Sequence, residues 1–349
     1  MRIDRRARRR RRRIFYLCTV FFVLLVAALI VWIIRLLPTK AASDSSSSAP
    51  SVSESSAPAD PVESEQSVAI SGSAGESSTG ESSTQESSAL PAVPDGYELL
   101  PVSEEALHQG ALILVNKTYA YEFPASQDLI SMYDLTDGLY SVSGTDVMMD
   151  AVAAQPLDNL LSDFYAATGI GSINILCGYR TLEESQELFD ASAEQNGLEH
   201  AERYVMLPGY SEHHSALSAD LGILLDGGGL DYYYPTDSYA WITEHAADYG
   251  FILRYPEDKT QITDIDYEAW HFRYVGFPHA QAMNELGFCL EEYIDFLKQY
   301  TVEGEHYTVG SYEIYYVPAA ESIPVPTGRS YEVSGNNVDG FIVTVGGAA

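Results

Sequence analysis

The chain has 349 residues and a formal net charge of −31 at pH 7, with 46% hydrophobic and 20% charged positions. That length is sufficient for one or two domains with buried cores. Residues 41–349 contain only 8 of the 19 basic residues but 49 of the 50 acidic ones. A segment this acidic repels phosphate backbones, which excludes nucleic acid as its partner. Three cysteines, one of them inside an apolar run, are too few for a disulfide framework.

The first 40 residues have the pattern of a membrane anchor. Nine arginines in residues 1–13 precede the 21 uncharged residues 14–34, which as a helix would span about 31 Å, the thickness of a bilayer core. The arginines disfavour a buried core helix, and the Arg-Leu-Leu-Pro after the run disfavours a cleaved signal peptide. We expect a basic cytoplasmic tail (1–13), one transmembrane helix (14–37) and a chain that continues outside the cytoplasm.

Composition divides the rest of the chain. Residues 38–94 are mostly Ser, Glu, Ala, Pro, Thr and Gly and cannot bury enough apolar surface to fold, so we expect a disordered linker. Residues 95–300 alternate short apolar runs with helical patterns at 148–167, 182–195, 241–249 and 278–286, which predicts an α+β domain. Residues 301–349 predict a β-rich extension, either a separate lobe or an addition to the main sheet.

Two segments combine the residue types of a catalytic zinc site. Residues 208–220 (PGYSEHHSALSAD) contain His213 and Asp220, and residues 265–276 (IDYEAWHFRYVG) contain Glu268 and His271. Two imidazoles and one carboxylate can hold a metal and leave a position open, with the second carboxylate as a base. The spacing alone leaves this as one interpretation. The isolated histidines are expected at the surface or at helix ends: His108, His200, His245, His279 and His306.

Two further motifs lie between and before these segments: Gly-Tyr-Arg at 178–180, and Trp241 followed by YGFILRYP at 249–256. With these four motifs in order, residues 110–290 resemble the VanY-type D-alanyl-D-alanine carboxypeptidases, zinc peptidases that trim peptidoglycan stem peptides. The resemblance implies a hedgehog-like fold, a small antiparallel sheet with flanking helices. It places zinc on His213, Asp220 and His271, a catalytic carboxylate on Glu268 and a substrate-facing arginine on Arg180.

These assignments agree with the chemistry of the residues. Glu268 would take a proton from the attacking water and pass it to the leaving amine. Arg180 would donate to the developing oxyanion or to the terminal carboxylate, with a surface ion pair as the alternative. Ser211 is a candidate substrate contact, with turn capping as the alternative, and Tyr210 is also assigned to the substrate. A flat strand would separate Glu268 from His271, so a bend near Ala269 is required.

The chain departs from the family pattern at three positions. Ala216 stands where the family usually has Gly, Ser218 where it has Ala, and Ser185 where it often has Gln. A glycine needed for a positive φ would not be replaced freely by alanine. We expect Cys177 and Cys289 to be free, buried thiols, with one disulfide as the alternative.

An aromatic loop, Asp-Tyr-Tyr-Tyr-Pro at 231–235, is either a contact for glycan or peptide or a partly buried anchor. The leading functional hypothesis is a monomeric, membrane-tethered zinc D,D-carboxypeptidase. An L,D-carboxypeptidase acting on tetrapeptide stems and a catalytically silent wall-binding module are the rivals, and the β-rich extension is a candidate specificity element.

Overall fold

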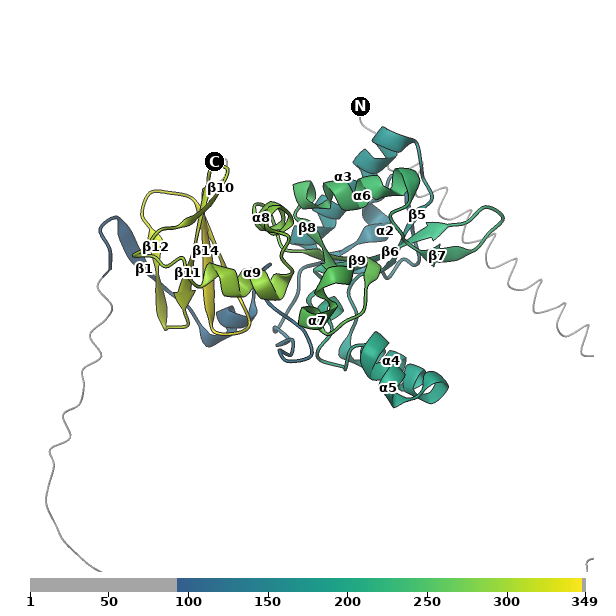
Figure 1. Ribbon diagram of the computed structural model, residues 1–349, viewed down its shortest axis with the longest axis horizontal. Coiled ribbons are helices and arrows are strands. Elements are labelled where there is room, and N and C mark those ends of the chain that lie inside the picture. Colours follow the sequence, from purple (N-terminus) through teal and green to yellow (C-terminus); the bar gives the residue numbers. More distant parts are fainter. Residues whose placement is uncertain (1–92, 347–349) are drawn as a thin grey trace, which may run out of the picture. The chain divides into compact units, whose positions relative to one another are not determined.

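The structure, a computed structural model, describes residues 93–346 (Figure 1). The predicted cytoplasmic tail, the predicted transmembrane helix and the linker up to residue 92 lie outside the described residues. Between residues 93 and 346, no helix is both long enough and apolar enough to cross a membrane.

The largest sheet carries the residues of the predicted site. Its strand order is β3 (Ser141–Val142), β5 (Ile173–Cys177), β6 (Ser218–Leu224), β9 (Glu268–Tyr274) and β8 (Phe251–Tyr255), with β7 (Leu230–Tyr232) paired to β6. In this sheet the β3–β5 pair is parallel and the other pairs are antiparallel. The α+β class and the mostly antiparallel sheet agree with the prediction.

Helix α3 (Ala151–Thr168) packs its apolar side against the strands of this sheet and shares one core with them. The predicted helix at 148–167 begins three residues late, because 148–150 form β4 (Met148–Asp150), paired with β2 (Leu129–Ser131). The side chain of Asp150 accepts a hydrogen bond from the Val152 amide and caps the helix. Gly169, with φ of 73°, ends the helix in the left-handed conformation.

The other predicted helices are present with small changes. The 182–195 pattern forms α4 (Leu182–Asn196), which begins with a capping box between Thr181 and Glu184 and is followed by α5 (Leu198–Tyr204). The 241–249 pattern splits into α6 (Ala240–His245) and the 3-10 helix η4 (Ala246–Tyr249). The 278–286 pattern forms α8 (His279–Leu286), and α9 (Leu290–Leu297) follows it. The remaining short helices are η1 (Glu104–His108), α2 (Met132–Leu135), η2 (Glu212–Ser215), η3 (Asp237–Tyr239), η5 (Glu257–Lys259) and α7 (Thr260–Thr263).

The C-terminal residues form a β lobe with its own sheet and core. The order is β10 (Tyr307–Val309), β11 (Tyr312–Pro318), β14 (Gly340–Val345) and β13 (Tyr331–Gly335), all antiparallel. A further strand, β12 (Ser322–Pro326), pairs with β1 (Tyr97–Pro101). The lobe therefore uses residues from both ends of the described chain, a pairing that no local sequence pattern indicated.

His279 lies at a helix end, one of the two locations predicted for it, but it is buried there, with only 6% of it exposed. Its Nδ1 lies 2.9 Å from the hydroxyl of Tyr293 on α9, and its Nε2 lies 2.9 Å from the hydroxyl of Thr344 on β14. The first residue of α8 therefore joins the catalytic part of the chain to the β lobe. Local sequence could not indicate the burial of His279, because its hydrogen-bond partner Thr344 is 65 residues further along the chain.

Candidate active site

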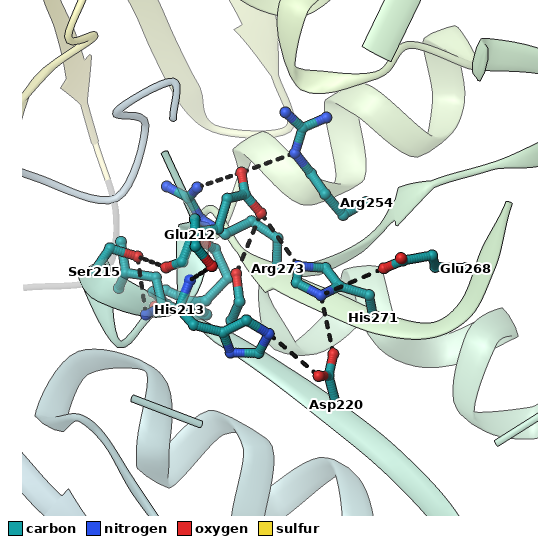
Figure 2. Close-up of polar contacts among 12 residues, drawn as sticks. Glu212, His213, Ser215, Asp220, Arg254, Glu268, His271 and Arg273 are labelled. Carbon is teal, nitrogen blue, oxygen red and sulfur yellow. Dashed lines mark hydrogen bonds and ion pairs between the residues drawn. The ribbon is translucent and has the colours of Figure 1, made fainter. Parts of the chain in front are cut away.

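The three predicted metal ligands converge at the centre of the large sheet (Figure 2). Asp220 on β6 lies directly opposite His271 on β9 in the strand register, and His213 comes from η2, just before β6. The Oδ1 atom of Asp220 lies 2.9 Å from Nδ1 of His271, and its Oδ2 lies 3.2 Å from Nε2 of His213. Both histidines are about 4% exposed. Antiparallel pairing thus brings together ligands that are 51 residues apart.

The second nitrogen of each imidazole has an acceptor of its own. Nδ1 of His213 lies 2.7 Å from the carbonyl oxygen of Gly178, and Nε2 of His271 lies 3.3 Å from Oε2 of Glu212. Because these oxygens only accept, those nitrogens carry the hydrogens, which leaves Nε2 of His213 and Nδ1 of His271 facing Asp220. Two imidazole nitrogens and a carboxylate facing one another are a donor set that suits zinc.

The charges around this set also suit a cation. Burial alone would raise the pKa of Asp220, but the His213 and His271 imidazoles hold that pKa below its ordinary value. Burial alone would lower the pKa of His213, yet Cys177 and Asp220 beside it raise the pKa to about 10. A metal ion would compete with these protons for the same nitrogens.

Glu268 reaches the same centre because β9 is irregular where it pairs with β8. Leu253 pairs with Phe272 and Tyr255 with Glu268, so three residues of β9 lie opposite the single residue Arg254. This irregularity is the bend expected near Ala269, and it leaves Oε2 of Glu268 3.9 Å from Nδ1 of His271. Burial raises the pKa of Glu268 to about 7, and a divalent cation nearby would lower it again.

Arg180 and Cys177 lie on the other side of the ligands. A register shift in β5 places Cys177 opposite Asp220, and its Sγ lies 3.7 Å from Nδ1 of His213. Nη2 of Arg180 donates to that sulfur at 3.2 Å, and the Arg180 amide donates to the His213 carbonyl at 3.1 Å. Both residues line a cavity of about 630 Å³, together with Glu184, Glu187 and Leu188.

Comparisons with known proteins decide the family. Residues 146–277 match the family model described as VanY, D-alanyl-D-alanine carboxypeptidase. A D-alanyl-D-alanine carboxypeptidase of Enterococcus faecium is 38% identical over 250 residues, 70% of this chain and 78% of that protein. The chain belongs to the VanY family.

Two further relatives support this assignment. The bifunctional D-Ala-D-Ala dipeptidase and carboxypeptidase VanXYC of Enterococcus gallinarum is 41% identical over 161 residues, 45% of this chain and 83% of that protein. The crystal structure of the vancomycin resistance D,D-dipeptidase VanXYg, in complex with a D-Ala-D-Ala phosphinate analog, is 34% identical. The match covers 71% of this chain and 98% of the VanXYg chain, with a TM-score of 0.63.

The two remaining predicted residues of the VanY site have local roles in the structure. Ser211 is 3% exposed, and its Oγ accepts a hydrogen bond from the His213 amide at 3.4 Å, which caps η2. That is the capping role kept as the alternative. The Tyr210 amide donates to the Leu207 carbonyl within a turn. Contacts of Ser211 and Tyr210 with substrate remain predictions.

Sequence reasoning missed a buried ionic cluster behind His271. Glu212 is 1% exposed, and its Oε1 accepts from Nε of Arg254 at 2.8 Å and from Nη1 of Arg273 at 2.7 Å. Burial alone would raise the pKa of Glu212, but the two arginines hold it well below its ordinary value. Arg254 also forms a two-pronged ion pair with Glu291 on α9. The available signal was an arginine inside each of two apolar strands, a position that requires a buried partner.

The structure shows the conformation or the surroundings of the three residues that depart from the VanY pattern. Ala216 has φ of +60°, the left-handed conformation that a glycine would adopt without strain. Ser218 donates to Oε2 of Glu212 at 3.2 Å, so its hydroxyl joins the buried cluster. Ser185 is 2% exposed.

Cys177 and Cys289 are free thiols, as expected. Cys289 is buried, whereas Cys177 is only half-buried and lies against the ligand His213. With His213 and Asp220 it forms a group whose ligand atoms all lie within 4.8 Å of one another. Nothing in the sequence placed this sulfur at the site.

The aromatic loop contains an anchor, and its contact with glycan or peptide stays a prediction. Tyr233 is fully buried, and its hydroxyl bonds with the Tyr239 carbonyl and the Thr243 hydroxyl, so it is an anchor. Tyr232 and Tyr234 are exposed, and the Tyr232 ring packs 4.4 Å from the ring of Trp270.

Proposed function

We propose that this VanY-family chain is a membrane-anchored zinc carboxypeptidase that removes the terminal D-alanine from peptidoglycan stem peptides outside the cytoplasm. The observation that carries the proposal is the convergence of Nε2 of His213, Nδ1 of His271 and the Asp220 carboxylate beside a half-buried second carboxylate, Glu268. Three protein ligands with one position left open are typical of catalytic rather than structural zinc sites.

The ligand residues define what a metal can do here. His213, Asp220 and His271 would hold the ion, with the acceptors Gly178 and Glu212 fixing the orientation of the two rings. When bound, zinc supplies Lewis acidity, which lowers the pKa of water and polarises a carbonyl group. With neutral imidazoles and an ionised Asp220, the loaded site would keep a net charge near +1, which favours an anionic transition state.

Glu268 moves the proton in this mechanism. Its carboxylate would accept a proton from the attacking water and deliver it to the amine of the departing D-alanine. Glu268 lies at the bend of β9, beside the ligands. It is not part of the directly opposed pair of strand residues, which is Asp220 and His271. Its partial burial limits the access of bulk water to the transferred proton.

Arg180 supports recognition of the peptide end. It lines the 630 Å³ cavity together with Cys177, whose sulfur lies against His213, and its backbone amide donates to the His213 carbonyl. A planar guanidinium can donate two parallel hydrogen bonds to a terminal carboxylate or stabilise the oxyanion. Either role would require a free carboxylate or a scissile carbonyl within reach of this cavity.

The membrane anchor rests on the sequence. Residues 14–34 carry no charge and follow nine arginines, a pattern that orients the N-terminus toward the cytoplasm. Residues 38–94, if disordered, would have a root-mean-square reach of roughly 40 Å and would let the catalytic part act on wall peptides at a distance from the membrane.

Amino-acid release from defined stem peptides tests the proposal. The purified full-length protein is incubated with a muramyl pentapeptide ending in D-Ala-D-Ala and with the corresponding tetrapeptide, with added zinc and with chelator. Zinc-dependent D-alanine release from the pentapeptide alone supports the D,D assignment. Release from the tetrapeptide alone would instead identify an L,D-carboxypeptidase. Peptide binding without turnover, in protein that holds zinc, would identify a silent wall-binding module.

A further inference from the structure

The two ligand histidines differ in how their orientation is fixed. His213 bonds to a main-chain carbonyl, that of Gly178, whereas His271 depends on a side chain, that of Glu212. A side-chain acceptor can be changed by one substitution that leaves the main chain in place, whereas any side chain at Gly178 would collide with the Met148 carbonyl oxygen and shift the main chain. Glu212 is therefore the place where the geometry of the metal site can be tested directly.

Each oxygen of the Glu212 carboxylate has its own partners (Figure 2). Its Oε1 accepts from Arg254 and Arg273, and its Oε2 accepts from the Ser218 hydroxyl at 3.2 Å and faces Nε2 of His271 at 3.3 Å. The Glu212 side chain and both arginine side chains are fully buried. Since two guanidinium groups bind one oxygen, the carboxylate cannot rotate away without leaving buried Arg273 with no carboxylate partner in the described part of the chain and Arg254 with Glu291 alone.

We propose that Glu212 is a positioning residue of the metal site, which holds His271 in the tautomer with its hydrogen on Nε2. The Nδ1 lone pair then points at the centre shared with Asp220 and Glu268. This inference rests on the proposed zinc site, because only a metal ligand requires that lone pair. The arginines compensate the buried charge of Glu212 and keep the carboxylate in place.

The substitution Glu212→Gln replaces one carboxylate oxygen by an NH₂ group and removes the negative charge. If the amide NH₂ faces His271, a donor opposes the Nε2 hydrogen, and the ring is driven to the tautomer with its hydrogen on Nδ1. If the amide instead faces the arginines, donors oppose two guanidinium groups. The second orientation keeps an acceptor for the Nε2 hydrogen but sets a donor against two cations, so the first orientation prevails and disfavours the ring state that binds metal. Zinc affinity should therefore fall about 10- to 100-fold, the usual effect of losing such a partner.

Glu291→Gln is the matched control. It also removes one carboxylate charge that contacts Arg254, from a half-buried residue, but Glu291 makes no hydrogen bond or ion pair with His271 among the described residues. Zinc affinity of the full-length proteins is measured by competition with a chromophoric chelator, without any assay of activity. A loss confined to Glu212→Gln supports the inference. Equal affinity in Glu212→Gln and wild type, or an equal loss in both variants, would overturn it.

A second measurement keeps the test valid if Glu212→Gln does not fold. Long-range ¹H–¹⁵N correlation spectra of the zinc-loaded wild type report which nitrogen of His271 carries hydrogen. Hydrogen on Nε2 and a metal-shifted Nδ1 support the inference, whereas hydrogen on Nδ1 would overturn it. A wild type that binds no zinc would overturn the proposed metal site itself, a result distinct from a wild type that binds zinc through the other nitrogen.

Discussion

Acid should weaken the contact between the catalytic part and the β lobe through His279. Burial lowers the pKa of His279 from 6.5 to about 3. The unfolded chain therefore binds a proton more readily than the folded one, and stability falls as the pH drops from 6.5 toward 3. Above pH 6.5 the effect is absent. At about pH 5 the loss is about 2 kcal/mol, and its full extent is about 5 kcal/mol.

The variant His279→Gln isolates this effect, because glutamine can still bond to Tyr293 and Thr344 but does not titrate. Urea unfolding of both proteins is followed by tryptophan fluorescence at about pH 7.5 and about pH 5. Between these two conditions the wild type should lose about 2 kcal/mol more of unfolding free energy than the variant. Equal losses in the two proteins would refute the neutral, buried state assigned to His279.

Three further outcomes concern the site. Arg180→Lys keeps the charge but removes the planar pair of donors, so kcat/KM on the pentapeptide should fall about 10- to 100-fold while zinc content is unchanged; a parallel loss of zinc would contradict a substrate role. Since no acyl-serine is required, turnover should persist in penicillin and stop with a chelator, and rapid penicillin inhibition would exclude the mechanism. The pKa values of His213 and His271 are raised, so zinc must displace protons from these rings and its affinity should fall as the pH is lowered. Calorimetry in buffers of different ionisation enthalpy measures the protons released. A pH-independent affinity would contradict this ligand set.

The parts of the fold and site that sequence could indicate are those encoded locally. Helix boundaries near α4 and α8 followed from caps and apolar spacing, and the four motifs indicated the family before any geometry was known. The need for a bend near Ala269 could be deduced because Glu268 and His271 are three residues apart in a strand pattern. The register shift that provides the bend could not, because it depends on how β9 pairs with β8.

Contacts between distant segments were out of reach of the sequence. The burial of His279 could not be predicted, because its partner Thr344 belongs to a lobe whose packing no local pattern specifies. Cys177 looked like an ordinary strand residue until the register shift in β5 set it opposite Asp220. Glu212 stood beside a predicted ligand, but its importance depends on arginines from two other strands, Arg254 and Arg273, 42 and 61 residues further along.

The central claim is that His271 helps to hold zinc while Glu268 moves the proton. The most direct test measures zinc content and D-alanine release on the same samples of wild type, His271→Ala and Glu268→Gln. We expect one zinc per wild-type chain, loss of both metal and turnover in His271→Ala, and retained zinc with turnover reduced about 10²- to 10⁴-fold in Glu268→Gln. Turnover close to wild type in Glu268→Gln, or full activity in protein stripped of zinc, would contradict the account.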